Sequence, residues 1–311
     1  MRLIDRLLRE LPFSLGELAV LVRSAPYRYK VYEIPKRQPG QFRTIAQPSA
    51  EIKVIQRWLM ENILKSLPVH RAATAYREGI SIADHAKRHA KRKFLLKMDF
   101  KDFFPSITFD DVRKHLIKHK RFTDEEARLV SHLVCWRDKS QREYCLSIGA
   151  PSSPLLSNTL MYEFDKKMMA ICKESKVIYS RYADDLAFST NHRDVLRSIE
   201  SSVKNVCKEL DYPRLKVNPK KTVSVSRAHR KVLVGLVLTP EGAISLGREK
   251  KRLLRAKLHR FSTGALVEDE VSSLRGELAF AWSVEPSFIA SLLVSFGVRV
   301  FRELELPFEL E

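Results

Sequence analysis

The sequence predicts an α+β fold in which a small sheet is covered by helices. Three apolar runs have the length and composition of buried strands, namely Phe94 to Asp99, Val177 to Tyr182 and Leu186 to Thr190. Around them, apolar residues recur three or four positions apart, as on one face of a helix. The 311 residues are enough for two or three subdomains that share more than one core.

The region before the first buried strand begins with a predicted hairpin. Tyr29 to Ile34 and Phe42 to Ile45 have strand-like residues, and Pro39 with Gly40 marks the turn between them. A helix that ends before Pro68 is expected next, because four apolar residues share one helix face: Ile52, Ile55, Leu59 and Ile63.

The middle region alternates strands with helices. Helices are expected from about Asp110, after Thr123, whose following acids complement a helix N-terminus, and from Pro154 to about Glu174. Asn191 is expected to cap a further helix, and Val232 to Leu236 reads as one strand. This order is typical of an α+β sheet layer.

From about Leu246 onward the sequence is helical. The basic residues of the first helix lie on one arc: Arg248, Lys251, Arg252 and Arg255. Its apolar residues lie on another arc: Leu254, Leu258 and Phe261. Such a helix can pack and hold phosphate at the same time. The acidic end, Glu303 to Glu311, is expected to be a frayed or docked tail.

The charge balance predicts a polyanionic partner. Lys and Arg total 56 against 37 Asp and Glu, which gives a formal net charge of +19. The most apolar uncharged stretch, Phe288 to Val298, is shorter than the roughly 20 residues of a bilayer span. Charged residues interrupt Met1 to Glu10, so no export signal is expected there. We therefore expect no membrane partner and a cytoplasmic location.

Cysteine and glycine patterns exclude several classes of site. The four cysteines include no Cys-x-x-Cys pair, so we expect reduced, packed thiols rather than a zinc site or redox couple. The ten glycines form neither G-x-G-x-x-G nor G-x-x-x-x-G-K-[ST]. A dinucleotide fold and a P-loop are therefore excluded, and nucleotide chemistry needs another way to bind phosphate.

Two acids, Asp184 and Asp185, lie between the two predicted strands in Arg181-Tyr182-Ala183-Asp184-Asp185. Buried acids need a partner or a metal ion. An ordinary polar hairpin turn is the alternative, since so short a motif matches often by chance.

A third acid, Asp99, ends the strand that begins at Phe94. If this strand pairs beside the hairpin, Asp99 and Asp184 converge and raise each other's pKa unless a cation is present. Magnesium takes hard oxygen ligands and binds to one or two carboxylates plus substrate phosphates. Two such ions can activate a hydroxyl and stabilise the leaving oxygen in phosphoryl transfer.

Five segments in order resemble the reverse transcriptases, and among them the bacterial retron enzymes. Tyr182-Ala183-Asp184-Asp185 is similar to the metal-binding hairpin of the family, and Asp99-Phe100-Lys101-Asp102-Phe103-Phe104-Pro105-Ser106 to its first acid motif. The other matches are the fingers motif Arg43-Thr44-Ile45 with Pro48, the segment Gly149-Ala150-Pro151-Ser152-Ser153-Pro154 and the lysine motif Val217-Asn218-Pro219-Lys220-Lys221-Thr222. The resemblance implies a right-hand polymerase with fingers, palm and helical thumb.

The resemblance implies roles for the acid motifs. Asp99 and Asp184 would bind two Mg²⁺ ions, for which Mn²⁺ could substitute, and Asp185 would complete the acidic cluster. Phe100 would contribute its backbone carbonyl. Lys221 matches the lysine proposed to protonate the departing pyrophosphate, although the adjacent Lys220 remains an alternative.

It also implies a site for the incoming deoxynucleoside triphosphate. Arg43 is the candidate for the triphosphate clamp, since a guanidinium grips phosphate oxygens in a fork, and a solvated surface charge is the alternative. Lys36 is a second choice, and Gly149 lies in the segment that supports template and nucleotide. Phe104 matches the aromatic gate that excludes ribonucleotides, and the alternative for Phe103 and Phe104 is core packing, which we expect for Phe103.

Other features concern RNA binding. The basic segment with Lys87 and Arg88 and the arc of the thumb helix are expected to contact RNA. His85 and His89 would share a helix face, for which RNA contact or local packing is expected rather than a zinc pair. Here the sequence departs from the retron pattern, which has Asn where His85 lies. Ile148 and Val234 depart from it too, replacing Gln and Thr.

The expected organisation is fingers and N-terminal region in 1–93, palm in 94–245 with inserted fingers elements near 113–146, and thumb in 246–311. Asp102 is expected to be structural. By resemblance, the template is a dedicated structured non-coding RNA whose own 2′-hydroxyl primes synthesis, and the product is a branched RNA-DNA, called msDNA in retrons. An effector protein in anti-phage defence is the expected partner. A host ribonuclease H is also expected, because the thumb region has no room for a nuclease domain.

Two alternatives remain from the sequence. One is another small bacterial reverse transcriptase, of the intron or diversity-generating type. The other is a nonenzymatic RNA-binding scaffold or antitoxin, against which the intact Asp99, Asp184 and Asp185 argue.

Overall fold

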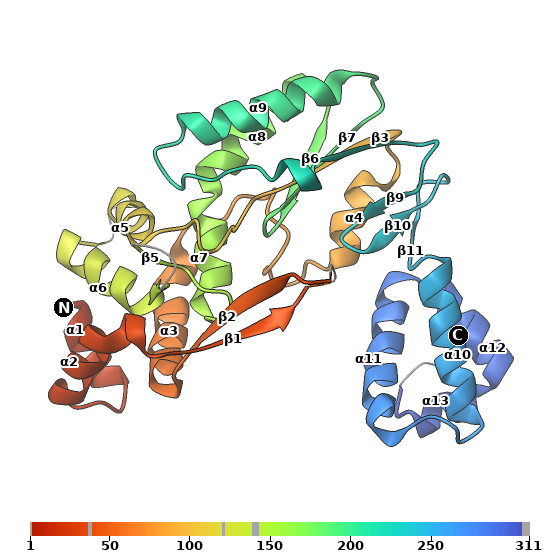
Figure 1. Ribbon diagram of the computed structural model, residues 1–311, viewed down its shortest axis with the longest axis horizontal. Helices are drawn as coiled ribbons and strands as arrows, with labels where there is room; N and C mark the ends of the chain where they lie inside the picture. The colour runs from red at the N-terminus through yellow and green to blue at the C-terminus, as the bar shows by residue number, and fades with distance from the viewer. Residues whose placement is uncertain (1, 37–38, 120–121, 139–142, 307–311) are drawn as a thin grey trace.

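The computed structural model describes residues 2–36, 39–119, 122–138 and 143–306. The N-terminal helices and the C-terminal helices lie at opposite ends of the molecule, with a sheet between them (Figure 1). No helix in these ranges has the length and apolar character to cross a bilayer. The four cysteines are free thiols, as predicted, and three of them are buried.

The central sheet has four antiparallel strands, and its order is β6 (Ile178–Tyr182), β7 (Asp185–Thr190), β3 (Phe94–Asp99) and β8 (Val223–Ser226). The β3 strand has the predicted bounds, and the β6–β7 hairpin also confirms the prediction. Leu96 and Met98 of β3 face one hydrophobic core, and Leu95 belongs to the other. Burial on both faces explains why this strand is a continuous apolar run.

Helices cover both faces of the sheet. On one face α8 (Tyr162–Glu174) packs against β6, and α9 (Val195–Glu209) packs against β7 and β3. On the other face α4 (Ile82–Ala90) contacts β6 and β7. The hairpin and the end of β3 are therefore set on a sheet that is fixed from both sides.

The N-terminal end shares the larger core with the sheet. Its elements are α1 (Leu3–Glu10), α2 (Leu15–Ser24), η1 (Ala25–Tyr27), β1 (Tyr29–Pro35), β2 (Phe42–Pro48), α3 (Ala50–Asn62), η2 (Leu64–Ser66), α5 (Phe109–Lys118), α6 (Asp124–Val134), β4 (Trp136–Arg137), β5 (Tyr144–Cys145) and α7 (Ser152–Leu160). Thr123 caps α6 as predicted, since its side chain accepts a hydrogen bond from the Glu126 amide.

The C-terminal end has a second core. This core joins α4 to seven later elements, namely β9 (Lys231–Leu233), β10 (Leu236–Leu238), β11 (Ile244–Ser245), α10 (Arg248–Ser262), α11 (Glu268–Val284), α12 (Pro286–Phe296) and α13 (Val298–Glu303). The short helix η3 (Pro219–Lys221) precedes β8 and is not part of it. Leu254 and Leu258 are buried, whereas Arg248, Arg252 and Arg255 are exposed, which confirms the two arcs of this helix. The domain bounds at 93 and 245 stay a prediction.

Three local predictions were wrong. The helix expected from Pro154 to Glu174 is two helices, because the backbone turns at Met161 with ψ 1° and no proline or glycine marks the turn. Asn191 does not cap α9. Its side chain accepts a hydrogen bond from the Lys93 amide, and Asp194 with φ 65° precedes the helix.

The third correction concerns Val232 to Leu236, which is a hairpin and not one strand. Val234 and Gly235 both have positive φ, 45° and 81°, so they form the turn between β9 and β10. A β-branched residue is rare in this conformation, so Val234 does not read as a turn residue in the sequence. Of the acidic tail, residues 307–311 lie outside the described residues.

Candidate active site

The sheet brings the three predicted aspartates together. Asp99 at the end of β3 is paired in register with Asp185 at the start of β7. The amide of Phe100 donates a hydrogen bond to the backbone carbonyl of Asp184 over 3.2 Å. The amide of Asn218 donates to the carbonyl of Asp99 over 2.7 Å. Residues 85 positions apart therefore lie at one edge of the sheet, next to the lysine motif.

The acids repel one another in this arrangement. Burial raises the pKa of Asp184, and the negative charge of Asp99 raises it further, while Lys221 and Arg43 act in the opposite direction. Asp185 is exposed as a residue, but desolvation by the surrounding sheet raises the pKa of its carboxyl to about 6, with Asp184 and Asp99 adding to the shift. A divalent cation would relieve both effects.

Lys221 supplies the positive charge beside Asp99 in this structure. Its Nζ lies 2.8 Å from Oδ2 of Asp99, whose side chain is 6% exposed. Desolvation acts to lower the pKa of Lys221, but the hydrogen bond to Asp99 and the charges of Asp184 and Asp185 raise it overall. Lys220 is exposed, and only its amide, which donates to Asn218, has a hydrogen-bond partner in the described chain. The structure therefore favours Lys221 over Lys220 as the functional lysine.

The donor set fits a hard divalent ion. Oδ1 of Asp99 is buried and, among the described residues, has no hydrogen-bond partner. Carboxylate oxygens are the ligands that Mg²⁺ prefers. As the side chains stand, no group of three His, Cys, Asp or Glu in the described chain is arranged to hold a metal ion. Oδ1 of Asp99 is thus left for an ion, and the other two carboxylates would have to move to complete its ligands.

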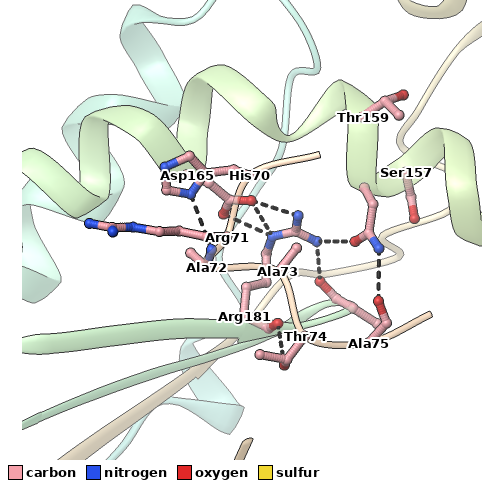
Figure 2. A network of polar contacts seen from close by, with 12 residues as sticks. His70, Arg71, Ala72, Ala73, Thr74, Ala75, Ser157, Thr159, Asp165 and Arg181 are labelled. Atoms are coloured by element: carbon pink, nitrogen blue, oxygen red, sulfur yellow. Dashed lines mark hydrogen bonds and ion pairs between the residues drawn. The ribbon is translucent and has the colours of Figure 1, made fainter. Parts of the chain in front are cut away.

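A buried arginine, Arg181, lies three residues before Asp184, and Figure 2 shows the network of polar contacts around it. Arg181 is fully buried, and its guanidinium forms an ion pair with Asp165 of α8 at 2.7 Å. The same guanidinium donates to the side-chain oxygen of Asn158 on α7 and to the carbonyl of Ala183, both at 3.1 Å. Ala183 has φ 56°, an unfavourable backbone conformation that this hydrogen bond helps to fix.

The network extends to the segment before α4. Asn158 donates to the carbonyl of Ala75 at 2.8 Å, and the amide of Thr74 donates to the carbonyl of Arg181. Tyr76 follows with φ 58° and an exposed side chain. Desolvation is the main cause that raises the pKa of its hydroxyl, and the negative charge of Asp184 raises this pKa further, so the ring lies near the acids. We did not predict Arg181, Asn158, Asp165 or Tyr76 as site residues. Two sequence signals pointed to this network: Arg181 is a charge inside an apolar strand, and Asn158 closely follows the family segment that begins at Gly149.

The two phenylalanines of the first acid motif separate as predicted. Phe103 is buried at 3% exposure, whereas Phe104 is half-buried. This separation does not come from the alternating faces of a strand, because both residues lie in a turn. Phe100 packs its ring on Phe103 and Phe164, so only its backbone is left for a metal ion. Asp102 is exposed with φ 47°.

The predicted nucleotide-binding residues lie on or beside the β1–β2 hairpin. Arg43 on β2 is exposed and lowers the pKa of Asp184, which places its charge near the acids. Lys36 is exposed at the end of β1. Gly149 has φ 118°, and a Cβ there would lie 3.0 Å from Ile45 and 3.1 Å from the Ala46 carbonyl. Glycine is thus required where this loop meets β2.

The predicted RNA-binding residues divide into two groups. Lys87 and Arg88 on α4 are exposed, as are Arg248 and Arg252 on α10. Lys251 instead forms an ion pair with Glu285 within the thumb. The guanidinium of Arg255 lies over Phe288 at 5.7 Å from the ring centroid. Lys251 and Arg255 are thus held partly by internal contacts.

His85 and His89 are core residues, which selects local packing from the alternatives. His89 hydrogen-bonds to Ser189 and Ser180 through its two ring nitrogens, at 2.8 and 2.7 Å. His85 hydrogen-bonds to Thr74, and its ring packs on Tyr182 at 5.6 Å. Burial lowers the pKa of His85 to about 4, so the pair is neutral near pH 7.

An acidic hairpin and a second acidic strand end on an antiparallel sheet, with a lysine beside them, define the palm of a nucleic-acid polymerase. A family model described as "Reverse transcriptase (RNA-dependent DNA polymerase)" matches residues 34–252. The Retron Ec83 reverse transcriptase of Escherichia coli is 40% identical over 92% of this chain and 93% of its own length. The Retron Ec73 reverse transcriptase of the same species is 33% identical over 91% and 90%.

The chain belongs to the reverse transcriptase family and is a retron-type reverse transcriptase, an RNA-directed DNA polymerase. Its template is therefore RNA, its substrates are deoxynucleoside triphosphates, and the family uses divalent metal ions. A solved telomerase from Candida tropicalis, in complex with a TWJ fragment of telomeric RNA, shares the fold with TM-score 0.51 and 14% identity. That match covers 88% of this chain and 55% of the telomerase chain.

Replacing Lys221 by Ala is expected to lower the turnover number for DNA synthesis by about 100-fold, the lower range for loss of a general acid. The matched control is Lys220→Ala, which removes the same charge one residue away and is expected to retain most of the activity. Both are measured on poly(rA)·oligo(dT). A larger loss in Lys220→Ala would reverse the assignment.

The thermal stability of the protein is expected to depend on pH and Mg²⁺ together. The folded-state pKa of Asp185, about 6, lies above its ordinary value of 3.8, so the folded protein binds more protons between these values. Its contribution to the free energy of unfolding is therefore lost as the pH rises through this window. We expect Mg²⁺ to raise the Tm more at about pH 7.5 than near pH 5, measured against EDTA. An equal rise at both values would contradict binding to these carboxylates.

Proposed function

We propose that this enzyme copies a dedicated structured non-coding RNA, starts from a 2′-hydroxyl of that RNA and makes a branched RNA-DNA product. The observation that carries the proposal is the 40% identity to a retron reverse transcriptase over nearly the whole of both chains, together with the intact Asp99, Asp184 and Asp185. An effector protein, a host ribonuclease H and a role in defence against phage complete the proposal.

The residues of the site have distinct roles in the proposed reaction. The hydroxyl oxygen of the primer attacks the α-phosphorus of the nucleotide, and the bond to pyrophosphate breaks. Two Mg²⁺ ions held by Asp99, Asp184 and Asp185, with the Phe100 carbonyl, would lower the pKa of the hydroxyl and stabilise the developing charge. Lys221 holds a proton near Asp99 that it can give to the pyrophosphate. Arg43 binds the triphosphate, with Lys36 beside it, and Gly149 lets the supporting loop approach β2.

The Phe104→Ala variant is expected to incorporate ribonucleotides more readily than the wild-type enzyme. The half-buried ring of Phe104 leans on Phe103 at 5.3 Å, so its position is fixed and it can collide with a 2′-hydroxyl. The measurement is kcat/KM for dTTP and UTP on poly(rA)·oligo(dT), and their ratio should fall at least tenfold. A ratio equal to that of the wild-type enzyme would mean that Phe104 only packs.

The test of the proposed function is purification of the protein from cells that carry its native locus. We expect a bound nucleic acid that loses mass with ribonuclease and with deoxyribonuclease. The Asp184→Asn protein, purified the same way, should carry RNA alone. A nucleic acid that is insensitive to deoxyribonuclease in the wild-type protein would contradict the proposed product, and an RNA encoded away from the gene would favour an intron or diversity-generating element.

A further inference from the structure

A groove lies between α9 and the chain that follows it. After α9 the segment 210–222 turns back beneath the helix, on the side of the molecule away from the thumb (Figure 1). The hollow between them has a volume of about 1020 Å³. A second hollow of about 540 Å³ shares Asp211, Arg214 and Lys216 with it and continues toward Lys101. Together they form one track along the edge of the palm.

The three acids that line the larger hollow form ion pairs. Glu200 pairs with Lys204 at 2.7 Å, and both lie on α9. Glu209 pairs with Lys167 of α8 at 2.8 Å. Asp211 pairs with Lys114 of α5 at 3.5 Å. Each acid of the larger hollow therefore has a cation beside it, whereas further acids, Asp102, Asp110, Asp111 and Glu143, line the smaller hollow.

Three cations of the groove have no such partner. Lys208, Arg214 and Lys216 are exposed, and none of them forms an ion pair with any described residue. They come from both walls, Lys208 from α9 and the other two from the returning segment. Cations that face one hollow from two sides bind a phosphate better than cations scattered on a surface, since they reach the same group.

The floor of the groove is apolar. It is formed by Leu210, Leu215 and Val217, of which Leu215 is 6% exposed. A floor of this kind suits the base or sugar of a nucleotide, while cations at the rim suit its phosphate. Val217, Pro219 and Thr222 also line the hollow, and they belong to the lysine motif, whose Lys221 contacts Asp99. The groove thus adjoins the active site, but its lining does not include Asp99, Asp184, Asp185 or Lys221.

We propose that this groove binds nucleotide units of an RNA strand, with phosphates on Lys208, Arg214 and Lys216 and a base or sugar on the apolar floor. The RNA is part of the molecule that the enzyme copies but lies outside the template segment. This assignment rests on the proposed function, in which the enzyme holds a structured RNA and not only a template and primer. A free nucleotide has the same base, sugar and phosphate as a unit of RNA, so it would also fit the groove.

The test compares the triple variant Lys208→Ala, Arg214→Ala and Lys216→Ala with a matched control of equal charge, Lys166→Ala, Lys173→Ala and Arg193→Ala. The control residues are exposed and have no ion pair among the described residues. The probe is labelled oligouridylate, titrated at several salt concentrations. We expect the groove variant to bind at least tenfold more weakly at low salt, and the slope of log K against log salt to fall by about 2, roughly 0.7 for each lost phosphate contact.

Equal losses in both triple variants would overturn the proposal, because net charge alone would then explain them. A groove variant that loses binding of adenosine monophosphate but keeps that of oligouridylate would also overturn it and assign a free nucleotide. DNA synthesis on poly(rA)·oligo(dT) should be unchanged in the groove variant. If the wild-type protein showed no synthesis on this substrate, the proposed polymerase function would be wrong, whereas a failure of the groove proposal alone would leave that synthesis intact. The two failures are therefore distinguishable.

Discussion

Replacing Asp184 by Asn is expected to reduce metal-dependent DNA synthesis on the order of a thousandfold or more, equivalent to about 4 kcal/mol of lost stabilisation. Asp184 follows the left-handed Ala183 at the tip of the hairpin and lies beside Asp99. Asn keeps the shape but removes the charge that a divalent ion needs. The measurement is single-turnover synthesis on poly(rA)·oligo(dT) across a range of Mg²⁺ concentrations.

The matched control for this variant is Asp102→Asn. Asp102 lies three residues after Asp99, is exposed, and has φ 47°, a conformation that Asn adopts about as well as Asp. We expect this control to retain its activity, and both variants to bind RNA as the wild-type protein does. Undiminished synthesis by Asp184→Asn would refute the assignment of the site.

The sequence was sufficient for the centre of the site because strand patterns are local. An apolar run that ends in Asp99 and a pair of short runs around Asp184 and Asp185 specify their strands without further information. The register that pairs Asp99 with Asp185 is then set by which faces are buried. The ordered family motifs supplied the rest of the polymerase assignment.

Features that depend on contacts between distant segments could not be predicted in this way. Asp165 reads as a surface residue of a helix, yet it is the buried partner of Arg181. His89 lies in a basic stretch that suggested RNA contact, yet the serines that hold it are 91 and 100 residues away. Polar groups in a core are identified by their partners, and no local pattern names a partner.

The basic residues of the thumb show that a local pattern can predict which residues share a helix face but not which of them have a partner. The arc of basic residues on α10 was predicted correctly as an arc. Spacing alone could not reveal that Lys251 meets Glu285, which is 34 residues later. Its charge is therefore largely used inside the thumb, whereas Arg252 on the same arc remains exposed.

Replacing Arg181 by Met is expected to destabilise the protein by about 3–5 kcal/mol, because it leaves the carboxylate of Asp165 buried without its partner. Tyr179 still donates to that carboxylate at 2.6 Å, but a neutral donor cannot balance the charge. The measurement is the free energy of unfolding in urea. The control is Arg113→Met, which breaks partly exposed ion pairs with Asp110 and Asp124 and should cost about 1 kcal/mol or less.

The double variant Arg181→Met with Asp165→Leu separates the stability of the core from the geometry of the hairpin. Without the buried carboxylate, much of the lost stability should return, since apolar pairs replace buried ion pairs at little cost. The donor to the Ala183 carbonyl is still missing, so the residue before Asp184 loses the contact that fixes its left-handed conformation. We therefore expect synthesis by the double variant to stay at least tenfold low, with a higher Mg²⁺ requirement. If activity returned together with stability, Arg181 would serve only to hold the core, and the hairpin would keep its shape unaided.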